Sequence, residues 1–173
     1  MKFVSFLLKG QPKFGISDGN NITDLTGKIK GAQTLKELIS NKSLQEAKDF
    51  SKKNPGKINH NEIEYLPVIP NPGKIVCVGL NYSEHVKETG RTVEQNPVIF
   101  LRVPESQTAH KQPIQRPKVS ESLDYECEMA VIMGDAGKHI KPENALKHIV
   151  GYSCYNECTA VSYTHLTLPT SVM

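Results

Sequence analysis

Short apolar runs alternate with polar and turn-forming residues along the first part of the chain. Runs of this length that contain β-branched and aromatic residues are typical of strands. They predict strands over residues 3–8, 13–17 and 21–25. A small sheet is therefore expected at the amino-terminal end.

Two helices are expected after these strands. Thr34 and Ser43 each precede a glutamate by three residues, which is the capping-box pattern of a helix start. Leu35, Leu38 and Ile39 then give the first helix an apolar stripe. Sheet and helices together predict a small α/β module.

Proline punctuation suggests where this module ends. Residues 67–72 contain three prolines, which favour a stiff, extended connection. The connection separates an amino-terminal module over residues 1–66 from a second part over residues 73–160. In that second part, strands, short helices and a long loop at 104–122 predict a mixed α and β domain.

Two carboxylates precede an apolar strand predicted at residues 130–133. Glu126 and Glu128 are two positions apart, so in an extended chain they project from one face. Carboxylates that share a small space repel unless a proton or cation lies between them, and Mg²⁺ or Mn²⁺ favours such oxygen ligands. A solvated surface pair is the alternative that these residues alone leave open.

A histidine and a glutamate follow another predicted strand, at residues 75–80. Asn81 is expected to cap a short helix that Gly90 closes, and His85 and Glu88 then share one helical face. A carboxylate beside an imidazole raises its basicity, as a general base requires. A surface pair again remains possible, and so does a surface role for Glu157, at the end of a strand predicted over 151–155.

Composition indicates an ordinary globular chain. It has 173 residues, of which 38% are hydrophobic and 23% charged, and the net charge of +3 is too small and scattered to favour nucleic acid. No apolar run is long enough for a membrane helix, and no secretory signal is recognisable. The four cysteines lack a CxxC spacing, which favours buried, reduced thiols and a cytoplasmic location over zinc binding.

Four sequence runs together resemble the fumarylacetoacetate hydrolase family. In order they are KIVCVGLNYSEHVKE at 74–88, PVIFLR at 97–102, DYECE at 124–128 and GYSCYNE at 151–157. The resemblance implies a β-rich α+β fold with a mixed, barrel-like sheet, preceded by the small module. It also implies a homodimer when the protein is full length.

The resemblance assigns roles to the residues noted above. Glu126 and Glu128 become metal ligands with Glu157, where the family usually has aspartate. His85 and Glu88 match the pair that activates water. Arg102 lies where many relatives have lysine and is expected to bind a small anionic substrate.

The implied function is that of a hydrolase, isomerase or decarboxylase dependent on Mg²⁺ or Mn²⁺. Its substrate is expected to be a small oxo-acid or β-diketo acid, such as an acylpyruvate. The run VSYTHLTLPTSVM at 161–173 departs from the family and is interpreted as a non-native tail. The alternative function is therefore a truncated, catalytically inactive fragment of such an enzyme.

Overall fold

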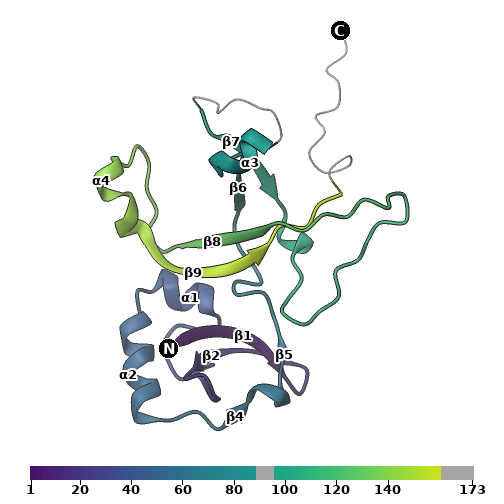
Figure 1. Cartoon of the computed structure of the whole chain (residues 1–173). Helices are drawn as coiled ribbons and strands as arrows, with labels where there is room; N and C mark the ends of the chain where they lie inside the picture. The colour runs from purple at the N-terminus through teal and green to yellow at the C-terminus, as the bar shows by residue number, and fades with distance from the viewer. Residues whose placement is uncertain (89–95, 161–173) are drawn as a thin grey trace.

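The computed structural model describes residues 1–88 and 96–160, except for the side chains of His85 and Glu88. In these residues it contains one five-stranded sheet and two separate two-stranded hairpins. Figure 1 shows the five-stranded sheet with helices α1 and α2 at the amino-terminal end, and the two hairpins beyond it. Every strand pairing described is antiparallel.

The amino-terminal sheet has the strand order β4-β3-β2-β1-β5. A two-residue turn, Lys9 and Gly10 with φ of 52° and 76°, joins β1 to β2, and such positive values match the twist of a hairpin. The three strands predicted here are confirmed. The five strands are β1 (Lys2–Leu8), β2 (Gln11–Ser17), β3 (Asn21–Asp24), β4 (Ile58–Asn59) and β5 (Glu64–Tyr65).

Helices α1 (Leu35–Ser40) and α2 (Leu44–Lys53) begin differently. The capping box predicted at Thr34 is confirmed, because its hydroxyl accepts the Glu37 N–H while the Glu37 carboxylate accepts the Thr34 N–H. The one predicted at Ser43 is wrong, since its side chain makes no capping hydrogen bond. Its φ and ψ of −93° and 18° lie outside the extended region that an N-cap adopts.

The hydrophobic core lies between β2 of this sheet and the two helices. Its buried members come from β2, from the connection between β3 and α1, and from the two helices: Phe14, Ile16, Leu25, Ile29, Ala32, Leu35, Leu38, Ile39 and Ala47. Each large apolar side chain removed from water contributes about 1.5–3 kcal/mol. This burial therefore holds the sheet and the two helices together as one module.

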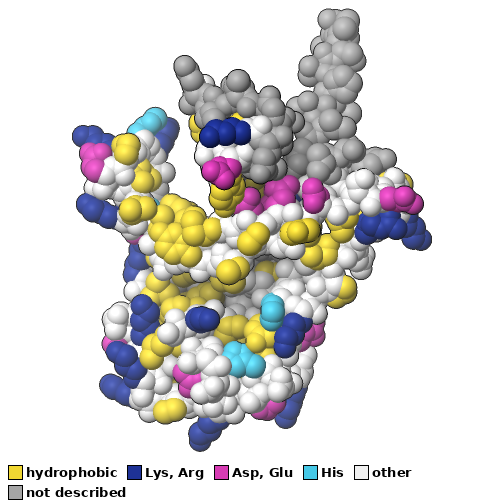
Figure 2. Space-filling model, in the orientation of Figure 1, with side chains coloured by type: hydrophobic (Ala, Val, Ile, Leu, Met, Phe, Trp, Pro, Cys, Tyr) yellow, Lys and Arg dark blue, Asp and Glu magenta, His cyan; other side chains and the backbone are white. Residues whose placement is uncertain are grey.

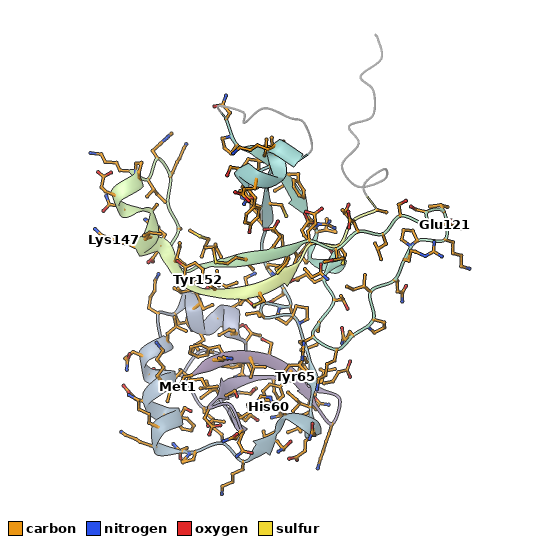
Figure 3. The ribbon with its side chains drawn as sticks, viewed as in Figure 1. Met1, His60, Tyr65, Glu121, Lys147 and Tyr152 are labelled. Atoms are coloured by element: carbon orange, nitrogen blue, oxygen red, sulfur yellow. The ribbon has the colours of Figure 1, made fainter. Side chains whose placement is uncertain are left out.

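Short elements close the other edge of the sheet. His60, in the 3₁₀ turn η1 (His60–Glu62), bonds Ser17 Oγ through Nε2 and Tyr65 Oη through Nδ1, both at 2.8 Å. Figure 3 shows His60 and Tyr65 close to each other at this edge. The contacts attach η1 and β5 to the sheet.

The proline-rich segment is held against the module. Ser5 Oγ donates a hydrogen bond of 2.8 Å to the Val68 carbonyl, and Val68 and Ile69 pack against the hydrophobic core. Gln107 Nε2, from the long loop, donates to the Ile69 carbonyl at 3.3 Å. Contacts from both sides thus fix the path of the chain into the second part.

Two hairpins build the second part. β6 (Ile75–Gly79) pairs with β7 (Val98–Arg102), and β8 (Cys127–Met133) pairs with β9 (Ile149–Asn156). β8 begins three residues earlier than predicted, because Cys127, Glu128 and Met129 continue its alternation of exposed and half-buried positions. Two short α-helices and two 3₁₀ helices are also described in this part: α3 (Ser83–Glu88), η2 (Pro104–Ser106), α4 (Pro142–Ala145) and η3 (Leu146–His148).

The β8–β9 hairpin curls over α1 (Figure 1). Ile132, on its inner face, packs against the module's core, and Lys42 Nζ pairs with Asp135 and donates to the Gly134 carbonyl at 2.8 Å. Its other face is exposed and largely apolar, and Figure 2 shows apolar side chains gathered over the end of the hairpin next to α4. That face carries Met129, Val131, Met133, Val150 and Tyr152.

All four cysteines are free, as expected, but they are less buried than expected. Cys127 and Cys154 are exposed because they lie on the outer face of the β8–β9 hairpin.

Helix α3 begins at Ser83, one residue later than a cap at Asn81 implies, and Gly90 lies outside the described residues. Within the described ranges, no helix has the length and apolar character needed to cross a membrane.

Candidate metal centre

Glu126 and Glu157 lie opposite each other where the β8–β9 ladder continues beyond the two strands. The Glu157 N–H donates to the Glu126 carbonyl at 2.8 Å, and a bridge between Asp124 and Thr159 extends the same register. The Glu126 N–H donates to Asn156 Oδ1 at 3.1 Å. Opposite residues in an antiparallel pair project to one face, so register directs these two side chains to the same side of the hairpin.

Glu128 joins the same face because it is two residues beyond Glu126. It lies opposite Tyr155 and is half-buried, as are the inward positions that follow it on β8. The predicted sharing of a face by Glu126 and Glu128 is confirmed by this register. Acidic side chains gather along this edge of the hairpin, beside β6 and β7 (Figure 2).

Tyr82 connects the segment before α3 to this face. Its hydroxyl donates a hydrogen bond of 3.1 Å to Glu128 Oε2. That hydrogen bond, reinforced by the charge of Glu128, raises the pKa of the Tyr82 hydroxyl. The tyrosine therefore stays protonated and remains a donor to the carboxylate.

Arg102, at the end of β7, forms an ion pair with Glu157. The two side chains are 15% and 7% exposed, and Arg102 Nη2 also donates to the Cys158 carbonyl at 3.1 Å. Among the side chains that the structure describes, Glu157 is the one charged group that is buried. A buried carboxylate needs a partner of this kind, because an unpaired charge is costly away from water.

Neutral groups surround the ion pair. Burial, followed by the charge of Glu157, raises the pKa of the Cys77 thiol, while Arg102 opposes the shift. Burial likewise raises the pKa of the Tyr155 hydroxyl. The charge of Glu128 also raises the pKa of the Cys77 thiol. Cys77 therefore interacts electrostatically with two of the three carboxylates.

The donor types and their register fit a divalent cation, but the carboxylate oxygens do not converge. In the part of the chain that the structure describes, no group of three or more His, Cys, Asp or Glu side chains is close enough to hold a metal ion. The ion pair accounts for this, since Glu157 is turned to Arg102. Arg102, expected to face a substrate, is occupied by the same contact.

The remaining predicted residues are placed only in part. Backbone positions put His85 and Glu88 on α3, but both side chains lie outside the described residues. The sequence reasoning gave no role to Tyr82 or Asn156, which contact Glu128 and the Glu126 N–H. Both lie within the sequence runs that carry the family resemblance, and this was the one sign in the sequence that they belong to the site.

Comparison with known proteins then decides the family. Residues 74–170 match the family described as fumarylacetoacetate (FAA) hydrolase, C-terminal. This chain belongs to the fumarylacetoacetate hydrolase family. The match includes all six predicted site residues.

Relatives include the mitochondrial oxaloacetate tautomerase fahd2 of Xenopus laevis, which is 34% identical over 167 residues. This alignment covers 92% of the chain and 52% of that protein. The human mitochondrial oxaloacetate tautomerase FAHD2A is 35% identical over 99 residues, with coverages of 57% and 32%. The chain thus spans about half the length of the Xenopus relative.

Solved structures confirm the β-rich fold of the fumarylacetoacetate hydrolase family. A fumarylacetoacetate hydrolase from Exiguobacterium antarcticum superposes with a TM-score of 0.76 at 29% identity, covering 94% of this chain and 57% of that one. Maleylpyruvate hydrolase from Sphingobium sp. SYK-6, solved with manganese(II) and pyruvate, gives 0.75 at 20% identity, with coverages of 91% and 58%. The second likeness shows the fold alone.

Proposed function

We propose that this family member is a hydrolase, isomerase or decarboxylase that uses Mg²⁺ or Mn²⁺ and acts on a small oxo-acid. The observation that carries the proposal is the common face of Glu126, Glu128 and Glu157, set by the β8–β9 register. Three carboxylates beside one buried guanidinium form a site for a cation and an anion together. Hard divalent cations favour oxygen ligands of this type.

The chain's own groups have distinct proposed roles. Glu126, Glu128 and Glu157 would hold the ion, which supplies Lewis-acid stabilisation of negative charge on a substrate oxygen when bound. Tyr82 orients Glu128 through its hydrogen bond. Arg102 would meet the substrate carboxylate as a planar fork once it is free of Glu157.

His85 and Glu88 are proposed as the proton-handling pair. They lie three residues apart on α3, a spacing that sets two side chains on one helical face. In a hydrolysis, His85 would take a proton from water while Glu88 orients the imidazole. An isomerisation requires proton transfer without an attacking water, so the same pair serves either reaction.

Relatives guide the choice of substrates. The Xenopus and human proteins named above are oxaloacetate tautomerases, and the Sphingobium structure contains manganese and pyruvate. These names support a substrate with a carboxylate next to a keto group. Oxaloacetate and an acylpyruvate are therefore the two test compounds that we propose.

The deciding experiment measures Mn²⁺ binding by calorimetry and activity by absorbance in the complete protein. Glu128→Ala should weaken Mn²⁺ binding at least tenfold, because a ligand oxygen and a negative charge are lost. Glu121→Ala, in the exposed part of the long loop, is the matched control and should bind as the wild type does. Equal affinity in both variants, or turnover that persists in excess chelator, would disprove the metal-dependent function.

The rival proposal is a catalytically inactive fragment. The exposed apolar faces of both hairpins favour it, because such faces are normally covered in a complete fold. Metal binding without turnover of either compound would support this rival. The cytoplasmic location and the homodimer expected from the sequence remain proposals.

A further inference from the structure

One contact explains why three carboxylates on a shared face do not form a metal cluster. Glu157 is directed to Arg102, and the pair is almost fully removed from solvent. Arg102 is itself anchored, since Nη2 donates to the Cys158 carbonyl, next to Glu157 in the chain. The guanidinium thus holds both the side chain of Glu157 and the backbone that follows it.

We propose that Arg102 is a latch that competes with the metal ion for Glu157. In the latched state described here, Glu157 is bound to the guanidinium. In the loaded state its carboxylate moves to the cation, and Arg102 is released. This proposal rests on the metal-dependent function above and adds a positioning residue that sets how readily the site loads.

The competition follows from charge and burial. A buried Glu157 is stable only with a cationic partner. Among the described residues that partner is Arg102, and a bound metal ion would be the alternative. Because the carboxylate cannot satisfy both fully, the apparent dissociation constant rises in inverse proportion to the unlatched fraction. A latch that is closed in about nine molecules of ten weakens metal binding about tenfold.

Release of Arg102 couples loading to substrate binding. The guanidinium that leaves Glu157 is left with a buried charge beside the Lewis-acid site, and an anionic substrate is the natural new partner. Arg102 Nε, which is buried and has no hydrogen-bond partner within the described residues, provides a further donor for such an anion. Metal and anionic substrate should therefore bind cooperatively.

The test is a double-mutant cycle with Mn²⁺ as the probe and calorimetry at pH 8 as the readout, without turnover. Arg102→Met should tighten Mn²⁺ binding about tenfold, because Glu157 is no longer held. In a Glu157→Gln background the same Arg102→Met change should alter affinity by less than about threefold. That background separates a specific latch from the general effect of a nearby positive charge.

A conservative variant guards against a folding defect in Arg102→Met. Arg102→Lys keeps the charge but loses the planar fork that reaches both Glu157 and the Cys158 carbonyl, so it should tighten Mn²⁺ binding by a few fold. Equal or weaker binding in Arg102→Lys overturns the latch, and so does an equal effect of Arg102→Met in both backgrounds. If Glu128→Ala also leaves Mn²⁺ binding unchanged, the proposed metal centre is wrong. If Glu128→Ala weakens Mn²⁺ binding but neither Arg102 variant tightens it, only the latch is rejected.

Discussion

Glu126 and Glu157 are joined through their backbones, by a hydrogen bond of 2.8 Å from the Glu157 N–H to the Glu126 carbonyl, and both side chains project to the same face of the hairpin. The two residues are 31 positions apart in the sequence. The β8–β9 ladder therefore fixes the distance between the backbones of two candidate metal ligands, whatever their side chains contact. The ion pair of Glu157 with Arg102 then decides which partner this carboxylate has.

Loss of Glu157 should destabilise the fold. Glu157→Ala leaves the Arg102 guanidinium buried and uncompensated, which is expected to cost about 3–5 kcal/mol in the free energy of unfolding. Glu157→Gln keeps an acceptor for the guanidinium and should cost less. Denaturant unfolding of both variants measures the difference, and equal losses would show that the ion pair's charge contributes nothing.

Acid should weaken the contact between Asp24 and Lys13. Burial raises the pKa of Asp24, but the Lys13 ammonium at 2.6 Å and the Thr26 N–H at 2.8 Å outweigh it and lower the pKa below its ordinary 3.8. A lowered pKa contributes stability above the unfolded value, which is lost as pH falls below about 3.8 through the folded value.

Asp24→Asn should therefore be less stable than the wild type at neutral pH, with a difference that shrinks as pH falls below about 4. Urea unfolding at several pH values gives this comparison. Lys13→Met should retain part of the pH dependence, because the Thr26 N–H still stabilises the carboxylate. A constant gap between wild type and Asp24→Asn across this range would contradict the assignment.

Backbone packing makes Gly15 hard to replace. A Cβ there would collide with the Thr23 carbonyl oxygen on the neighbouring strand, so Gly15→Ala should force the sheet apart and cost about 2 kcal/mol or more. At Gly151, on β9, an added Cβ meets nothing within 4 Å, and Gly151→Ala is the matched control. Thermal unfolding should show a clear loss for the first variant and little change for the second.

Sequence reasoning predicted local structure well where one short spacing determined it. The Thr34 capping box and the shared face of Glu126 and Glu128 depend on spacings of three and two residues, which are visible in the sequence. The segment at Ser43, where the predicted capping box is absent, has the same pattern, with a glutamate three residues after a hydroxyl residue. There the tight link between the helices, with Lys42 at a φ of 58°, set the backbone instead.

Long-range pairing was beyond the reach of these patterns. Nothing local indicates that Arg102 contacts Glu157, because the partners lie on different hairpins and are brought together by tertiary packing. The same holds for Tyr82 and Glu128, which are 46 residues apart. Family resemblance supplied expected roles for three of these four residues, all but Tyr82, and for none of the contacts between them.

Removal of the proposed base should affect turnover and leave metal binding intact. His85→Ala in the complete protein is expected to lower the turnover number about tenfold to a thousandfold, because the imidazole handles a proton. Mn²⁺ affinity measured by calorimetry should equal that of the wild type, since His85 is not a proposed ligand. A parallel loss of metal would assign His85 to the metal site instead.

The outer face of the β8–β9 hairpin should control how this chain behaves in solution. Val131 and Tyr152 lie opposite each other on that face and are 41% and 58% exposed, with Met129 and Met133 beside Val131. A contiguous apolar sheet face attracts other chains, and the unpaired strand edges of a two-stranded hairpin reinforce this. The double variant Val131→Thr and Tyr152→Thr keeps residues that favour strands but makes the face less apolar, so the soluble fraction should rise and light scattering should fall.

Ile132→Thr, on the inner face that packs against the core, is the opposing control and should lower stability without reducing association. If the double variant scatters light as strongly as the wild type, this face does not drive association.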